Sequence, residues 1–457
     1  MIPSLGVGAV YWAALHPLFE AHPDIIQVAE VEPSSFWIKE IGPDGGVRSN
    51  PRTLAAIESL PQAKLLHGVG YPIGGTQGRS HPHLTEFRHW VDRLDPSWTS
   101  EHLSFNETGA GPTGFLLPPC QSADGVAIAA ANIRTRASAI GRPFAFETGV
   151  NYLPPNGEEM PDGAYFAAVA EAADCHILLD LHNLWANERN GRARLRDVLA
   201  ALPLDRVCEV HLAGGQEKDG YWLDAHSGLV PADLIDLALD LMPDLPAVGA
   251  IIFEVAPEHL RNVDAAAMVG QVEALHRLWE RRGRSAAPRP GLEEGLGGSL
   301  AAAEWESALV AALAAPEAGA SSAIALYRSL IGAFRSGALA TTLTHSLRLL
   351  QLTHGKPAVD RMLDDYHEAT RPPLYPSDEA IQFAAWLDVH APPTPYLADM
   401  LALERGIVAI ACGGDGGELR FDHDPSLIAA AIAEGRPPEG LARGDYRISL
   451  GLPLERP

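Results

Sequence analysis

The chain has 457 residues, a length that favours two or three domains, or one barrel of about 250 residues followed by a smaller domain. Its 34 basic and 58 acidic residues give a formal net charge of −24, which repels phosphate backbones and disfavours a nucleic-acid partner. The four cysteines are scattered and form no CxxC pair, so we expect neither disulfides nor a thiolate metal site. The sequence has no export signal and no run of about 18 apolar residues, so we expect a cytoplasmic protein without membrane spans.

Short apolar runs alternate with longer amphipathic segments as far as about residue 282, a pattern typical of βα units around a parallel sheet. Because eight such runs occur, we predict a (β/α)8 TIM barrel. The predicted strands are 4–10, 25–31, 63–67, 98–103, 143–147, 176–181, 206–212 and 248–254. Helices are predicted between them, among others at 123–139, 158–174, 193–202 and 262–282.

The composition changes after residue 282, where Arg, Pro and Gly cluster as in a linker. Beyond the linker, Leu326, Leu330 and Phe334 follow helical spacing. Further helices are predicted at 341–352, 356–369, 377–390 and 395–405, and strands at 407–411 and 445–450. We therefore predict a barrel domain over 1–282, a linker over 283–299 and a mainly helical α+β domain over 300–457.

Six of the predicted strands end in histidine or a carboxylate, at the rim where TIM-barrel enzymes place their active sites. A lone residue of this kind is usually a hydrogen-bonded surface or core side chain. Six of them at one mouth would gather uncompensated charge, which is costly unless a cation is bound there. Asp224 and His226 follow the seventh strand closely. The six strand ends are His67, His102, Glu147, Asp180, His211 and Glu254.

Imidazole nitrogen and carboxylate oxygen without thiolate suit iron, zinc or manganese, and the ligand types alone do not choose among these metals. A glutamate between two ligand sets can bridge two ions, and Glu147 occupies such a place on the fifth strand. The predicted grouping is His67, His102 and Glu147 on one ion, Glu147, Asp180, His211 and Glu254 on a second, and Asn183, Asp224 and His226 on a third, weaker site.

The motifs around these residues resemble the multinuclear non-heme iron-dependent oxidative enzymes, which are relatives of the methanobactin biosynthesis oxidase. Their barrel is similar to that of apurinic endonucleases and xylose isomerases. The resemblance covers about residues 4–280 and implies oxidation, by two or three irons and dioxygen, of a residue, often cysteine, in a ribosomally made precursor peptide. The motifs are Leu66-His67-Gly68-Val69-Gly70, Ser100-Glu101-His102-Leu103-Ser104, Phe146-Glu147, Leu179-Asp180-Leu181-His182-Asn183-Leu184, Glu209-Val210-His211-Leu212-Ala213-Gly214 and Asp224-Ala225-His226.

Two features depart from that family's pattern. His182 stands where the family usually has asparagine, which implies a change in the third metal site or in a bond behind it. Ser34 and Ser35 occupy places where glutamate and asparagine are common after the second strand, which implies a different substrate or a different attacked residue.

The second predicted domain resembles the small partner protein that is usually encoded beside such oxidases and that helps to bind the leader of the precursor peptide. The resemblance implies that both proteins are fused here and that no separate partner is needed. Leucine and aromatic stripes at helical spacing are also typical of plain core packing. The residues that carry this resemblance are Tyr327-Arg328, Asp365-Tyr366, Pro373, 382–387, 396–399 and Leu403-Glu404.

Other functions stay open from the residues alone. A zinc- or manganese-dependent hydrolase or sugar isomerase would use similar ligands on the same barrel. An endonuclease needs a basic groove, which the net charge of −24 disfavours, and a sugar isomerase usually has a lysine in its site, which these strand ends lack. A non-catalytic, metal-stabilised peptide-binding protein is a further alternative, although structural metal sites tend to be closed by protein ligands.

Overall fold

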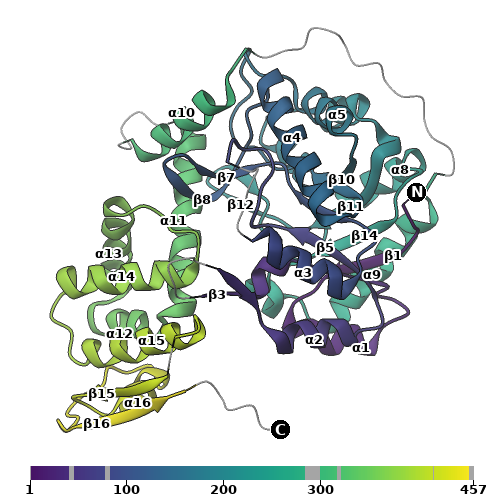
Figure 1. Ribbon diagram of the computed structural model, residues 1–457. Helices are drawn as coiled ribbons and strands as arrows, with labels where there is room; N and C mark the ends of the chain where they lie inside the picture. Colours follow the sequence, from purple (N-terminus) through teal and green to yellow (C-terminus); the bar gives the residue numbers. More distant parts are fainter. Residues whose placement is uncertain are drawn as a thin grey trace. The chain divides into compact units, whose positions relative to one another are not determined.

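The computed structural model describes residues 2–40, 46–77, 83–283, 299–315, 321–414 and 416–451. The chain forms two compact units, which we describe one at a time (Figure 1). The first comprises residues 1–37, 49–109 and 116–327, and the second residues 38–48, 110–115 and 328–457. Each unit combines segments that are distant in sequence, and the predicted domain bounds of 1–282 and 300–457 stay a prediction. Most of the predicted linker, 283–299, lies outside the described residues.

Eight parallel strands close into a barrel in the first unit, which confirms the predicted fold class (Figure 1). The strands follow one another around the barrel in chain order, and the last pairs with the first from Gly6 and Ala250 to Ala9 and Phe253. Each of the eight predicted strands is present. They are β1 (Gly6–Val10), β2 (Val28–Val31), β5 (Ala63–Gly68), β6 (Thr99–His102), β9 (Phe144–Glu147), β10 (His176–Asp180), β11 (Val207–Ala213) and β14 (Ala250–Glu254).

Helices follow the strands and surround the barrel (Figure 1). The longest, α4, begins where the Ser122 hydroxyl accepts a hydrogen bond from the N–H of Gly125 at 3.2 Å. It ends at Gly141, whose φ of 73° favours glycine. The helices of this unit are α1 (His16–Ala21), α2 (Pro51–Ser59), α3 (Leu84–Leu94), α4 (Ala123–Ile140), α5 (Asp162–Ala173), α6 (Leu181–Arg189), α7 (Leu195–Ala201), α8 (Ala232–Leu241), α9 (Ala265–Glu280) and α10 (Ala302–Ala314).

Two apolar layers form the core of the barrel unit. The larger lies between the strands and the helices, and a smaller one fills the barrel interior. In β9, Phe144 and Phe146 belong to the outer layer and Ala145 to the inner one. Because successive side chains of a strand point to opposite faces, the next inward position after Ala145 is Glu147. The same alternation directs the last residue of β10 and of β14 into the barrel.

Three two-stranded sheets lie in the connections that follow barrel strands. The hairpin of β12 and β13 follows β11 and leads into the loop that carries Asp224 and His226. The strands are β3 (Trp37–Lys39) with β4 (Val47–Ser49), β7 (Phe105–Thr108) with β8 (Gly111–Leu117), and β12 (Gln216–Lys218) with β13 (Tyr221–Leu223). The four cysteines of the chain are free and buried.

The second unit is mainly helical, as predicted, and its strands β15 and β16 pair antiparallel with α16 between them in the sequence (Figure 1). Its own core of leucine and aromatic side chains includes Leu350, Tyr366 and Phe383. The elements are α11 (Ser322–Thr342), which begins in the first unit, α12 (Thr344–His354), α13 (Lys356–Ala369), α14 (Pro376–His390), α15 (Leu397–Ala411), β15 (Gly417–Phe421), α16 (Pro425–Ala433) and β16 (Tyr446–Leu450). None of the helices in the described parts of the chain is long and apolar enough to span a membrane.

The predicted strand at 407–411 is wrong, because this segment is the last part of α15. The prediction rested on its run of apolar and β-branched residues. Upstream, Leu397, Met400, Leu401 and Glu404 are buried at helical spacing, and Val408 continues that stripe. Burial of the stripe against the core of the second unit outweighs the local strand propensity. The other predicted strand, 445–450, is confirmed as β16.

Candidate metal centre

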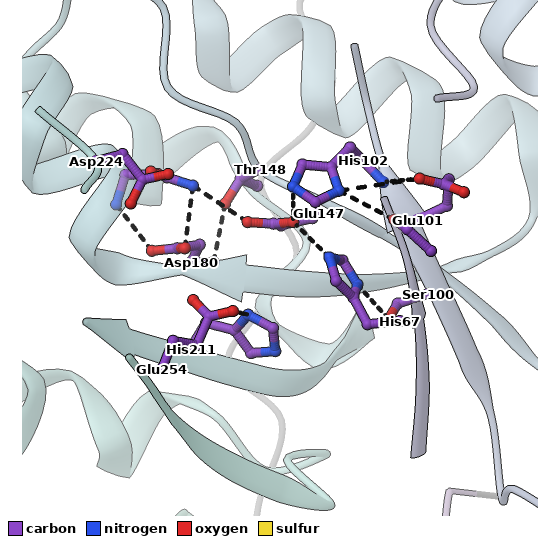
Figure 2. A network of polar contacts seen from close by, with 12 residues as sticks. His67, Ser100, Glu101, His102, Glu147, Thr148, Asp180, His211, Asp224 and Glu254 are labelled. Atoms are coloured by element: carbon purple, nitrogen blue, oxygen red, sulfur yellow. Dashed lines mark hydrogen bonds and ion pairs between the residues drawn. The ribbon is translucent and has the colours of Figure 1, made fainter. Parts of the chain in front are cut away.

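The carboxyl ends of the barrel strands hold a cluster of imidazoles and carboxylates (Figure 2). His67 and His102 converge on Glu147, since the Nε2 atom of each lies 3.2 Å from Glu147 Oε2. The other ring nitrogens are held from behind, His67 Nδ1 by Ser100 Oγ at 2.8 Å and His102 Nδ1 by the carbonyl of Gly68 at 3.0 Å. Because a carbonyl only accepts, His102 has a proton on Nδ1, and the neutral imidazole then has its lone pair on Nε2. This first group can therefore bind a cation through Nε2.

A second group shares Glu147 with the first. The ligand atoms of Glu147, Asp180 and His211 all lie within 4.8 Å of one another. Glu254 joins them, with Oε1 at 3.1 Å from His211 Nδ1. The structure therefore brings together the four residues predicted for a second ion, with Glu147 between the two groups as Figure 2 shows.

A third group lies where the loop after β13 meets the barrel rim. His226 Nε2 is 2.9 Å from Asp224 Oδ1 and 3.4 Å from Glu254 Oε2, and it also forms a group with Asp180 and Glu254. His226 has a φ of +46°, a conformation that is strained for residues other than glycine and is common at functional sites. Glu254 thus faces both His211 and His226, a shared position that sequence reasoning assigned to Glu147 alone.

Asn183, which was predicted for the third ion together with Asp224 and His226, is bonded to carboxylates of the second group. Its Nδ2 atom donates to Glu147 Oε1 at 3.1 Å and to Asp180 Oδ2 at 3.0 Å. Its backbone N–H donates to Asp180 Oδ1 at 2.8 Å, so Asp180 also caps the first turn of α6. The amide therefore fixes two carboxylates of the second group, and its Oδ1 atom has no hydrogen-bond partner among the described residues.

Sequence reasoning missed two glutamates that lie behind His211. Glu30 Oε1 is 3.1 Å and Glu209 Oε1 is 3.7 Å from His211 Nε2, and the three residues form a fourth group. Trp98 Nε1 donates to Glu209 Oε2 at 2.7 Å. Both glutamates lie inside their strands and not at the ends. The available signal was an acidic residue within the apolar run Val28-Ala29-Glu30-Val31, at an inward position of β2.

The electrostatics of the cluster follow from burial of many like charges. Burial and the neighbouring carboxylates of Glu147 and Glu254 raise the pKa of Asp180 well above its usual range. Burial disfavours the charged form of His226, but the carboxylates of Asp224 and Glu254 outweigh it and raise its pKa. Burial likewise raises the pKa of Glu30, against the attraction of His211. A bound cation would remove the need for these protons, because it supplies the positive charge that the carboxylates lack.

The donor set fits a cluster of metal ions. Buried polar atoms are normally paired. Within the described part of the chain, Asn183 Oδ1 is buried without a hydrogen-bond partner. The buried atoms His211 Nδ1, Glu254 Oε2 and Asp224 Oδ1 have ion-pair contacts with other residues of the cluster, at 3.1, 3.4 and 2.9 Å. Nitrogen and oxygen donors of this kind suit iron, zinc or manganese. The side chains of His102 and His226 are 22% and 28% exposed, so one side of the cluster is open to solvent.

Comparisons with known proteins place these ligands in a wider context. The family model for the RiPP precursor modification enzyme MbnB/TglH/ChrH matches residues 13–267. A UPF0276 protein of Anaeromyxobacter sp. is 30% identical over 224 residues, which are 49% of this chain and 79% of the relative. A UPF0276 protein of Chromobacterium violaceum is 35% identical over 165 residues, or 36% of this chain and 60% of the relative.

Solved structures with a similar arrangement have low sequence identity. A D-psicose 3-epimerase in the presence of D-fructose is 14% identical with a TM-score of 0.36, and the match covers 59% of this chain and 96% of the epimerase. A xylose isomerase domain protein of Planctomyces limnophilus is 13% identical with a TM-score of 0.38, over 62% of this chain and 99% of that protein.

Proposed function

Because this chain belongs to the MbnB/TglH/ChrH family of RiPP precursor modification enzymes, we propose that it oxidises a residue of a ribosomally made precursor peptide with two or three iron ions and dioxygen. The observation that carries the proposal is the sharing of ligands at the rim. Glu147 belongs to two ligand groups, and Glu254 lies between His211 and His226. Ions held by shared carboxylates are close enough to act on one substrate together.

Bound iron would pass electrons from the oxidised peptide residue to dioxygen and would offer a Lewis-acidic position for the substrate. The residues of the chain would hold the ions and orient the substrate. Asp180 and His211 are fully buried, which keeps water from one side of the cluster. The partly exposed side, with His102, Asp224 and His226, is where a peptide residue would enter. A cysteine is the first candidate for that residue, since its soft thiolate is a good ligand for iron and stays reduced in the cytoplasm.

We further propose that residues 300–457 recognise the leader of the precursor and take the place of a separate partner protein. Within the described residues, β15 and β16 pair only with each other, and an extended peptide would add to this sheet as a further strand. An added strand would bind through its backbone, which suits a leader that differs from the modified core. Anchoring the leader makes capture of the reacting residue intramolecular, with an effective concentration on the order of millimolar.

The test begins with elemental analysis of protein purified without added metal. The chain is then produced together with the short, cysteine-containing peptide encoded nearest to its gene, with and without dioxygen, and the peptide mass is compared. We expect iron in the protein and a dioxygen-dependent mass change that disappears when the cysteines are replaced by serine. Zinc or manganese in the protein, with a mass change that is independent of dioxygen, would instead support a hydrolase or isomerase.

A further inference from the structure

His182 is fully buried beside the third ligand group, and the function of this imidazole follows from its two neighbours. Its Nε2 atom accepts a hydrogen bond from Trp222 Nε1 at 3.0 Å, and its Nδ1 atom lies 3.2 Å from Asp224 Oδ1. We propose that His182 is a positioning residue, held by Trp222 in the form with the proton on Nδ1, which donates to Asp224 and directs this carboxylate toward the third ion. The proposal rests on the metal centre proposed above.

The indole of Trp222 decides where the proton of His182 lies. An indole N–H only donates, so His182 Nε2 must have a lone pair, and the one proton of a neutral imidazole is then on Nδ1. A protonated nitrogen cannot bind a metal ion. His182 is therefore a donor to Asp224 and not an additional ligand, although it lies next to the ligands in both sequence and space.

Both atoms of the inferred hydrogen bond are buried. Within the described chain no other hydrogen bond satisfies His182 Nδ1, and Asp224 Oδ1 also lies 2.9 Å from His226 Nε2. The backbone N–H of Asp224 donates to Tyr152 Oη at 3.1 Å. Tyr152 therefore fixes the backbone of Asp224, and His182 fixes its carboxylate. The lone pairs of the carboxylate that do not face His182 remain for a cation and for His226.

Trp222 is held too firmly to turn its N–H away from His182. Its backbone N–H donates to Asn190 Oδ1 at 2.7 Å, and Asn190 Nδ2 donates to the carbonyl of Trp222 at 2.9 Å. The Arg189 guanidinium lies 4.7 Å from the centre of its ring, and the ring of Trp185 packs edge-on at 5.2 Å. The orientation of the indole is thus set by several contacts before His182 is considered.

The backbone at Gly215 closes the other side of the same hydrogen bond. A Cβ atom at this position would lie 2.4 Å from Trp222 Nε1 and 2.6 Å from His182 Nε2, distances that real side chains do not adopt. Residue 215 must therefore be glycine if the indole and the imidazole are to meet. Three segments therefore form this contact: α6 with His182, β13 with Trp222, and the turn after β11 with Gly215.

The experiment compares substitutions that copy one ring nitrogen at a time. The amide nitrogen of asparagine lies near the place of imidazole Nδ1, whereas that of glutamine lies near Nε2. His182→Asn should therefore retain the donor to Asp224 and His182→Gln should lose it. Trp222→Phe removes the indole N–H, and Trp185→Phe is the matched control, an equivalent change in a neighbouring indole that is not bonded to His182. Iron per chain and the dissociation constant of the most weakly bound ion are measured by chelator titration, with circular dichroism to verify folding.

We expect His182→Gln and Trp222→Phe to weaken the third ion by about 10- to 100-fold and to leave the other two in place, the effect usual for residues that orient metal ligands. His182→Asn and Trp185→Phe should stay near the wild type. If the wild type binds three ions but Trp222→Phe leaves the third unchanged, or glutamine is tolerated better than asparagine, the assignment of His182 is wrong and the metal centre stands. A wild type that binds two ions but no third at saturating iron would overturn the assignment of His182 and leave a two-ion centre in place, whereas a wild type that binds no iron would overturn both.

Discussion

Glu147→Gln tests whether one carboxylate serves two ions. The substitution keeps the shape of the side chain and removes its charge. Glu147 Oε2 is 3.2 Å from the imidazoles of both His67 and His102, and its carboxylate also lies within 4.8 Å of the ligand atoms of Asp180 and His211. A cation held by either group would lie within about 4 Å of this charge. At that distance two unit charges interact by about 4 kcal/mol at an effective dielectric constant of 20, close to a thousandfold in each dissociation constant.

The assay is iron per chain and chelator-competition affinity, measured for the wild type, Glu147→Gln and a control, Glu306→Gln. Glu306 is also buried in the barrel unit, where it bonds Thr76, and it belongs to none of the ligand groups. We expect Glu147→Gln to lose two ions together and Glu306→Gln to lose none. Loss of one ion with full affinity at the other would refute the bridging arrangement, and undiminished iron would refute the grouping as a whole.

Three further predictions address the loop, the second unit and the pH dependence. Asp224→Ala should remove the third ion alone by elemental analysis, and loss of all metal would contradict the division into groups. A chain that ends after Tyr327 should bind iron but modify a full-length precursor poorly, as measured by mass spectrometry. As a control, this chain and the full-length chain should modify a leaderless peptide equally well. Equal turnover of the full precursor by the two chains would exclude leader recognition by the second unit. Burial lowers the pKa of His83 to about 4. The unfolded chain therefore takes up this proton first, and stability falls between about pH 6.5 and 4 by roughly 3 kcal/mol. In His83→Gln the free energy of unfolding, measured with urea, should no longer show this decline between about pH 6.5 and 4. An unchanged pH profile would show that His83 protonates freely in the folded chain.

The barrel strands could be predicted because each is a short apolar run between helical segments, and both faces of such a strand are buried. The strand-end residues could be predicted for the same reason, since a polar residue that ends a buried run must point to the rim. Glu30 and Glu209 were missed because they interrupt their strands from within, where only the inward register shows that they reach His211.

Other features of the site depend on the direction in which side chains point, which the sequence pattern does not show. Glu254 faces two histidines because its two oxygens point to opposite sides, and no spacing in the sequence encodes that. The relation of His182 to Trp222 joins residues 40 positions apart through a side-chain hydrogen bond. The segment 407–411 shows the opposite limit, because its local composition is typical of a strand while its burial pattern, which depends on the fold, is helical.

The burial of all four cysteines has a consequence for a protein whose proposed chemistry oxidises thiols. Burial raises the pKa of Cys175 to about 12 and that of Cys208 well above its usual range, so these groups stay protonated. The thiolate is the form that oxidants and alkylating reagents attack. Cys175 and Cys208 are therefore poor competitors of a substrate thiol, and repeated turnover in air should leave these two thiols intact.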